Sequence, residues 1–157
     1  MRSLSVIPVC LCLLAAAACD SGPDEPEIPE IETTTFAEAL DVDLSESTKT
    51  TNGLYYRDLE VGSGSEVATG QLVGTHYTGW LADGTKFGEN GASDAPLRFR
   101  LGIGQVIPGW DLGLPGMRVG GTRQLIIPPS LGYGARQNGP IPPYSILVFE
   151  VEVVSTE

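Results

Sequence analysis

Between residue 54 and the C-terminus, apolar and polar residues mostly alternate with a period of two, which is the pattern of strands buried on one face. In the last such run, Glu150 and Glu152 fall on one face while Phe149 and Val151 fall on the other. Asp83-Gly84 is a tight-turn signal between two of the runs. The predicted strands cover residues 54–61, 72–81, a short run around Phe87, 97–101, 122–127 and 146–154.

One segment of this region departs from the alternation and is predicted to be a helix, residues 108–114. Pro108 suits the first turn of a helix, and Pro115-Gly116 ends it. A run of strands with a single helix among them is typical of the α+β class. The sequence therefore predicts an antiparallel β-sheet of five to six strands wrapped around one short α-helix.

The first nineteen residues have the composition of an export signal. Met1-Arg2 gives a positive start, residues 4–14 are mostly apolar, and four alanines precede Cys19. This indicates a secretory signal peptide over residues 1–18, too short to remain as a membrane-spanning helix. A cysteine directly after small residues resembles the lipobox of bacterial lipoproteins, which implies acylation of Cys19. The alternative is an ordinary signal peptide with a coincidental cysteine.

Residues 19–50 are predicted to form a lipidated end followed by an acidic, proline-rich linker. Residues 20–49 hold ten of the twenty acidic residues and a single base. We expect a disordered, self-repelling tail, because such a composition cannot form a core. Apolar residues between 36 and 44 predict a short helix that packs on the domain, which is placed at residues 51–157. The remainder carries no basic stripe, which argues against nucleic acid as a partner.

The domain holds an aromatic set but no nucleophile–base pair and no cluster of metal ligands. All three cysteines precede it, so it has neither a disulfide nor a cysteine–metal site. His76 is the sole histidine and falls within a predicted strand, where a structural role is favoured over a ligand role. Gly102-Ile103-Gly104 lacks the Gly-Lys-Ser/Thr of a phosphate loop.

Seven motifs occur in a fixed order along the domain. They are Thr75-His76-Tyr77-Thr78-Gly79, Asp83-Gly84-Thr85-Lys86-Phe87, Leu97-Arg98-Phe99-Arg100-Leu101-Gly102, Gln105-Val106-Ile107-Pro108-Gly109-Trp110, Met117-Arg118-Val119-Gly120-Gly121, Leu131-Gly132-Tyr133-Gly134, and Ile141-Pro142-Pro143 leading to Phe149. From about Gly53 to Glu157 the chain thereby resembles the FKBP-type peptidyl-prolyl cis-trans isomerases. The resemblance implies a five- or six-stranded antiparallel sheet around a short helix, in agreement with the strand pattern.

The resemblance also implies which residues form the site. The catalytic set would be Tyr77, Phe87, Ile107, Trp110, Tyr133 and Phe149, and the substrate-binding set Leu97, Phe99, Val106 and Ile141. Trp110 would form the floor of the pocket and Tyr133 would donate a hydrogen bond at its rim. The Ile107 backbone N–H would donate to a substrate carbonyl.

Two residues depart from the family pattern. Gly88 stands where the family usually has an aspartate whose carboxylate bonds to the pocket tyrosine, here Tyr77. Ser93 replaces an arginine that often accompanies this network. Glu89 or Asp94 would take over the missing role if their loop folds inward. The changes bear on rate and peptide preference more than on fold.

The resemblance implies a peptidyl-prolyl cis-trans isomerase that assists the folding of exported proteins without a cofactor or a metal. The alternative is a non-catalytic module that binds proline motifs, which Gly88 and Ser93 favour. The implied partners are proline-containing polypeptides, the macrolide inhibitors of the family, and a membrane reached through the lipid on Cys19. We expect a monomer in the cell envelope that faces the periplasm or the exterior.

Overall fold

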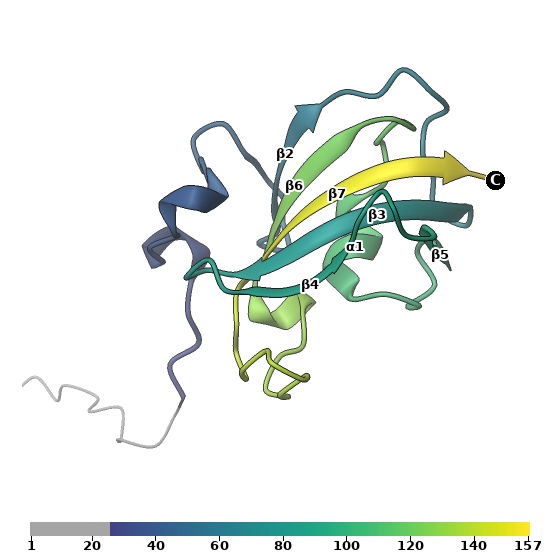
Figure 1. The fold of residues 1–157 in the computed structure, drawn as a ribbon. Coiled ribbons are helices and arrows are strands. Elements are labelled where there is room, and N and C mark those ends of the chain that lie inside the picture. The colour runs from purple at the N-terminus through teal and green to yellow at the C-terminus, as the bar shows by residue number, and fades with distance from the viewer. Residues whose placement is uncertain (1–25) are drawn as a thin grey trace, which may run out of the picture.

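The computed structural model describes residues 26–157, and its centre is an antiparallel sheet that curves around one short helix (Figure 1). The strands are β1 (Thr48–Lys49), β2 (Tyr55–Glu60), β3 (Leu72–Leu81), β4 (Lys86–Asn90), β5 (Leu97–Arg100), β6 (Thr122–Ile127) and β7 (Leu147–Thr156). The helix is α1 (Pro108–Gly113), and the short 3-10 turns are η1 (Ile31–Thr33), η2 (Glu38–Leu40) and η3 (Pro129–Leu131).

The strand order is β1-β2-β6-β7-β3-β4, and β5 shares the outer edge of β3 with β4. Residues 77–80 of β3 pair with β4, whereas residues 72–75 pair with β5. The predicted α+β class is confirmed, with strands and helix where the sequence pattern placed them. The sheet has seven strands instead of five to six, because the two-residue β1 lies in a segment predicted to be linker.

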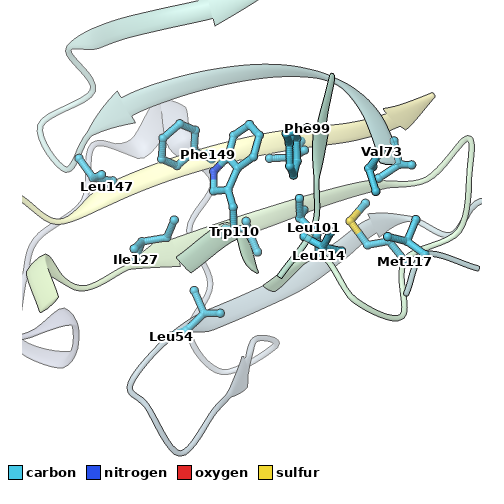
Figure 2. Close-up of a cluster of buried hydrophobic side chains, with 14 of the residues drawn as sticks. Leu54, Val73, Phe99, Leu101, Trp110, Leu114, Met117, Ile127, Leu147 and Phe149 are labelled. Atoms are coloured by element: carbon cyan, nitrogen blue, oxygen red, sulfur yellow. The ribbon is translucent and has the colours of Figure 1, made fainter. Parts of the chain in front are cut away.

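The inner face of the sheet packs on α1 and carries the main core. Trp110 from the helix lies in the middle of this core, with Phe149 and Phe99 on either side (Figure 2). The helix comes very close to the sheet: a Cβ on Gly109 would lie 2.6 Å from the Ile127 side chain. Pro108 at the first position fixes the start of the helix. Close packing therefore sets the position of Trp110.

The outer face of the sheet is covered by residues 31–49, which we call the strap. Ile31 and Leu40 of the strap are 2% and 5% exposed and pack with Ile126 and Val148. In Figure 1 the dark blue strap lies beside the end of the sheet where β3 turns into β4. The strap is therefore a second layer of the fold.

Polar contacts also hold the strap. The buried Gln124 side chain donates from Nε2 to the Leu40 carbonyl at 2.8 Å. Near the other end, Glu32 accepts from Lys49 and from the Tyr55 hydroxyl, the latter at 2.7 Å. The bond from Lys49, followed by that from Tyr55, lowers the pKa of Glu32 to about 2. The strap thus combines buried apolar anchors with exposed ion pairs.

From residue 31 onward, the segment predicted to be an acidic linker packs on the sheet. The helix predicted between 36 and 44 is realised only as the short turn η2, next to which the Ala37 N–H donates to the Ala82 carbonyl at 2.8 Å. The acidic side chains remain at the surface while isolated apolar residues insert. The folded unit therefore begins well before residue 51.

The predicted signal peptide and the predicted acylated Cys19 fall in residues 1–25, outside the described residues. Both assignments stay predictions. Within residues 26–157, no helix has the length and apolar character that crossing a membrane requires.

Candidate active site

Five aromatic side chains from five elements meet on the inner face. They are Tyr77 of β3, Phe87 of β4, Phe99 of β5, Trp110 of α1 and Phe149 of β7. Trp110 stands edge-on to Tyr77 and Phe149, with ring centroids 5.3 and 5.4 Å apart. Phe87 stands edge-on to Phe149 at 5.3 Å. Edge-to-face packing is the favoured arrangement of such rings, so each ring is held by its neighbours.

The rings open onto a cavity of about 600 Å³, a size suited to a short peptide segment or a small molecule. Phe99 is the one predicted site residue that does not line it. This ring is buried behind Trp110, at a centroid distance of 5.7 Å, and supports the floor from below. The other predicted residues all line the cavity: Tyr77, Phe87, Leu97, Val106, Ile107, Trp110, Tyr133, Ile141 and Phe149.

A few polar groups stand in this apolar wall. Ile107 precedes α1 in an extended conformation (φ −60°, ψ 148°), and its N–H makes no hydrogen bond within residues 26–157. Its carbonyl is used, since it accepts the Trp110 N–H at 2.9 Å. The hydroxyls of Tyr77 and Tyr133 likewise have no partner in the described part of the chain. The cavity therefore offers free donors to a ligand.

Loop residues outside the predicted site set complete the wall. A tight turn at Gly139-Pro140 forms one side of the cavity, closed by two backbone hydrogen bonds of 3.0 Å between Asn138 and Ile141. Gly139 has a φ of +55°, in the region that favours glycine. A Gly-Pro pair is a turn signal and could have identified this loop. Gly104 and Gln105 also line the cavity.

Gly88 lines the cavity beside the Tyr77 hydroxyl. A Cβ at this position would lie 3.9 Å from Tyr77 Oη and would meet no closer atom. The expected substitutes for a carboxylate here are engaged elsewhere. Asp94 accepts the Gly91 N–H at 2.9 Å, and Glu89 pairs with the lysine three residues before it. Neither carboxylate makes a hydrogen bond to the Tyr77 hydroxyl in the described part of the chain.

The cavity wall contains no ionisable group other than the two tyrosines. His76 lies outside it, with Nδ1 3.0 Å from Asn90 Oδ1, in the structural role expected for it. Among residues 26–157, no three His, Cys, Asp or Glu side chains are grouped to hold a metal ion. What these cavity residues can supply is an apolar environment, shape and a small number of hydrogen bonds.

Comparisons with known proteins agree with this site. A family model described as FKBP-type peptidyl-prolyl cis-trans isomerase matches residues 64–154. The FK506-binding protein of Neisseria meningitidis serogroup B is 50% identical over 103 residues, which cover 65% of this chain and 94% of that protein. Peptidyl-prolyl cis-trans isomerase FKBP15-3 of Arabidopsis thaliana is 40% identical over 140 residues, which cover 88% and 97%.

Solved structures agree as well. AtFKBP13 superposes with a TM-score of 0.66 at 40% identity, covering 71% of this chain and 99% of that one. FkpA from Escherichia coli superposes with a TM-score of 0.66 at 36% identity, covering 76% and 55%. All the residues that line the cavity fall within the segment that the family model matches.

Proposed function

The chain belongs to the FKBP-type peptidyl-prolyl cis-trans isomerase family and is an isomerase of that type, and on that basis we propose how and where it acts. It takes the X-Pro amide of a client polypeptide into the aromatic cavity, removes water from it and holds it in the twisted form. Its clients are proline-containing segments of exported proteins.

The energetics make such a cavity sufficient. Rotation of a peptide bond faces a barrier of about 18–20 kcal/mol, because resonance stabilises the planar amide. The planar form has the more polar carbonyl and is therefore the better hydrated of the two. Transfer into an apolar site removes this advantage, and contacts that fit the twisted form best add to the effect. A thousandfold acceleration needs only about 4 kcal/mol.

The observation that carries the proposal is the free Ile107 N–H at the wall of an otherwise apolar cavity. Trp110 gives the proline ring a flat floor, while Phe87 and Phe149 exclude water from the amide. The Ile107 N–H donates to a substrate carbonyl and fixes the segment in place. Tyr133 donates from its hydroxyl at the rim. No proton is transferred and no covalent bond is made.

The same cavity would take a macrolide inhibitor. Several relatives are named FK506-binding proteins, and a ligand of that kind would compete with the proline segment for the floor formed by Trp110. A cavity of about 600 Å³ has room for the buried part of such a molecule. We therefore expect FK506 to inhibit the reaction.

The test is a protease-coupled assay on short X-Pro peptides with the purified protein. Without an enzyme, the exchange takes roughly 10–100 s at room temperature. We expect an acceleration that FK506 abolishes. A folded protein that gives the buffer rate on several peptides would instead be a binding module.

The N-terminal sequence supports the proposed location of the protein in the cell envelope. An apolar signal that ends at Cys19 supports export and acylation, which would anchor the domain to a membrane of the cell envelope. Because residues 31–49 pack on the sheet, only the chain before residue 31 separates this anchor from the fold. The acidic residues there would repel anionic lipids and keep the cavity open to solvent.

This part of the proposal has its own test, replacement of Cys19 by serine in the full chain. The variant should move from the membrane fraction to the soluble fraction and keep its isomerase activity. Mass spectrometry of the native protein should show acyl chains on Cys19. An unlipidated native chain, or a serine variant that stays with the membrane, would show that Cys19 is only part of an ordinary signal-peptide junction.

A further inference from the structure

The loop of residues 102–107, which joins β5 to α1, supplies much of the cavity wall. Gly104, Gln105, Val106 and Ile107 all line the cavity. The loop also presents the free Ile107 N–H. Residues 102–104 form a turn, and the loop contains no strand or helix. The path of this loop sets where the donor and the Val106 side chain stand.

Asp111, in the first turn of α1, holds this loop with both oxygens of its carboxylate. Oδ1 accepts the Gly102 N–H at 2.7 Å, and Oδ2 accepts the Gly104 N–H at 2.9 Å. Hydrogen bonds to a charged acceptor are roughly twice as strong as neutral ones. Because Asp111 follows Trp110 directly, one short helix positions both the floor of the cavity and its adjacent wall.

The remaining restraints on the loop are few. Gly102 and Gly104 have φ angles of +83° and +74°, which a side chain would disfavour. Gln105 folds back, and its side-chain oxygen accepts the Arg100 N–H at 2.6 Å. No other bond joins the backbone N–H groups of residues 102–106 to the described part of the chain. Asp111 is therefore the main polar restraint on this wall.

We propose that Asp111 is a positioning residue of the isomerase, which acts through the 102–107 loop without touching the substrate. Its carboxylate fixes the glycine-rich half of the loop, so that the Ile107 N–H and Val106 meet the bound segment in the productive geometry. The proposal rests on the proposed function. A misplacement of about 1 Å in a site of this kind can cost as much as a hundredfold in rate.

The test is Asp111→Asn in the full chain. Asparagine has the same shape but offers one acceptor, so its amide nitrogen must face one of the two glycine N–H groups. The assay is run well below the unfolding temperature of the variant. Under these conditions, we expect kcat/KM on X-Pro peptides to fall about tenfold. Amide hydrogen exchange at Gly102 and Gly104 should quicken while exchange in β6 and β7 does not. Asp111→Glu keeps the carboxylate and should recover most of the activity.

Asp43→Asn is the matched control. This carboxylate also accepts two backbone N–H groups of a loop, from Ser45 at 2.8 Å and Glu46 at 3.3 Å, but it lies in the strap. Its loss should leave kcat/KM within twofold of the unchanged protein. A comparable fall in both variants would mean that activity follows general stability, and would overturn the proposal.

The remaining outcomes distinguish a failure of the positioning role of Asp111 from a failure of the proposed isomerase function. If the unchanged protein accelerates isomerisation and Asp111→Asn does so equally well, the positioning role is wrong and the proposed function stands. If activity is lost without faster exchange at Gly102 and Gly104, the loop is not the route and the proposal fails. If the unchanged protein is folded but gives the buffer rate, the proposed function fails, and the positioning role with it.

Discussion

The two faces of the sheet are closed in different ways, although neighbouring residues of the same strands supply both. In β7, Phe149 points to the inner face and Val148 to the outer one. The inner face packs on α1 with large side chains and leaves a cavity among them. The outer face is covered by the strap, which contributes single apolar anchors separated by acidic residues.

Because of this difference, the inner face serves both the reaction and the stability of the fold, whereas the strap serves stability alone. On the inner face one side chain can serve both purposes, since Trp110 is 3% exposed and still forms the floor of the cavity. On the outer face no strap residue lines the cavity. Damage to the inner face should therefore reduce folding and activity together, whereas damage to the strap should reduce stability alone.

The largest effect is expected for Trp110→Ala. Removing a buried tryptophan costs about 3–5 kcal/mol, a large part of the stability of an ordinary domain. The variant would also lose the floor on which Tyr77 and Phe149 pack. Urea denaturation and the peptide assay should show both losses. A variant that kept full activity would place the reaction outside this cavity.

Leu40→Ala tests the outer face in the same way. Leu40 is 5% exposed, and we expect the free energy of unfolding to fall by about 2 kcal/mol, near the lower end for such truncations, because the strap can relax. The bond from Gln124 goes to the Leu40 carbonyl and survives the change. Activity at low temperature should stay within twofold. Ile28→Ala, at a 61% exposed position, is the control and should be neutral in both measurements.

The sequence predicted the inner face better than the outer one, for a physical reason. Residues 72–81 were predicted from a mostly alternating pattern, and residues 122–127 from a strand-like run that Pro128-Pro129 ends; both predictions have the bounds that the structure has. Ile31 and Leu40 are nine residues apart among acids, and their burial depends on a surface that exists only in the folded sheet. No local pattern reports such a surface.

Prediction of the site from the sequence has the same limit. The aromatic residues of the cavity were predicted because they stand in ordered motifs on strands and on the helix. Alternation placed Phe99 on the correct face, but it cannot tell the layer that touches a ligand from the layer behind it. Asn138 and Gly104 reach the cavity through the paths of their loops. Those paths are set by tertiary contacts, such as the bonds of Asp111 to the loop.

A smaller effect, and a gain, is expected for Gly88→Asp. The new Cβ would lie 3.9 Å from Tyr77 Oη with no closer neighbour, so a carboxylate fits and can accept from the hydroxyl. A charge-assisted hydrogen bond is worth about 1.5–3 kcal/mol at best, and only part of it would favour the twisted substrate. We expect kcat/KM or the affinity for FK506 to rise several-fold.

Gly88→Ala is the matched control, because it fills the same space without an acceptor for Tyr77. Equal gains in the two variants would assign the effect to packing and not to the hydrogen bond. No gain in either variant would mean that the free Tyr77 hydroxyl does not limit the reaction. Calorimetry of FK506 binding separates tighter binding from a faster chemical step.

The smallest effect concerns Glu150 on the outer face. Burial, and secondly the nearby negative charge of Asp41, raise the pKa of this carboxyl, while Arg57 opposes the shift. A raised carboxyl pKa means that ionisation of the group destabilises the fold. This loss of stability develops as pH rises from about 4.5 through the raised pKa. Glu150→Gln should therefore be more stable than the unchanged protein at pH 7, by less than about 1 kcal/mol. The two should converge below pH 4 in thermal unfolding.

Glu32 in the strap should give the opposite sign, which makes Glu32→Gln the control for Glu150→Gln. The bonds from Lys49 and Tyr55 lower the pKa of Glu32 to about 2, so its ionised form stabilises the fold above the ordinary carboxyl range. This contribution is lost as pH falls from about 4.5 to about 2. The Gln variant should be less stable at pH 7, and the difference should vanish toward pH 2. If both Gln variants shifted stability in the same direction at pH 7, side-chain charge would not account for either shift.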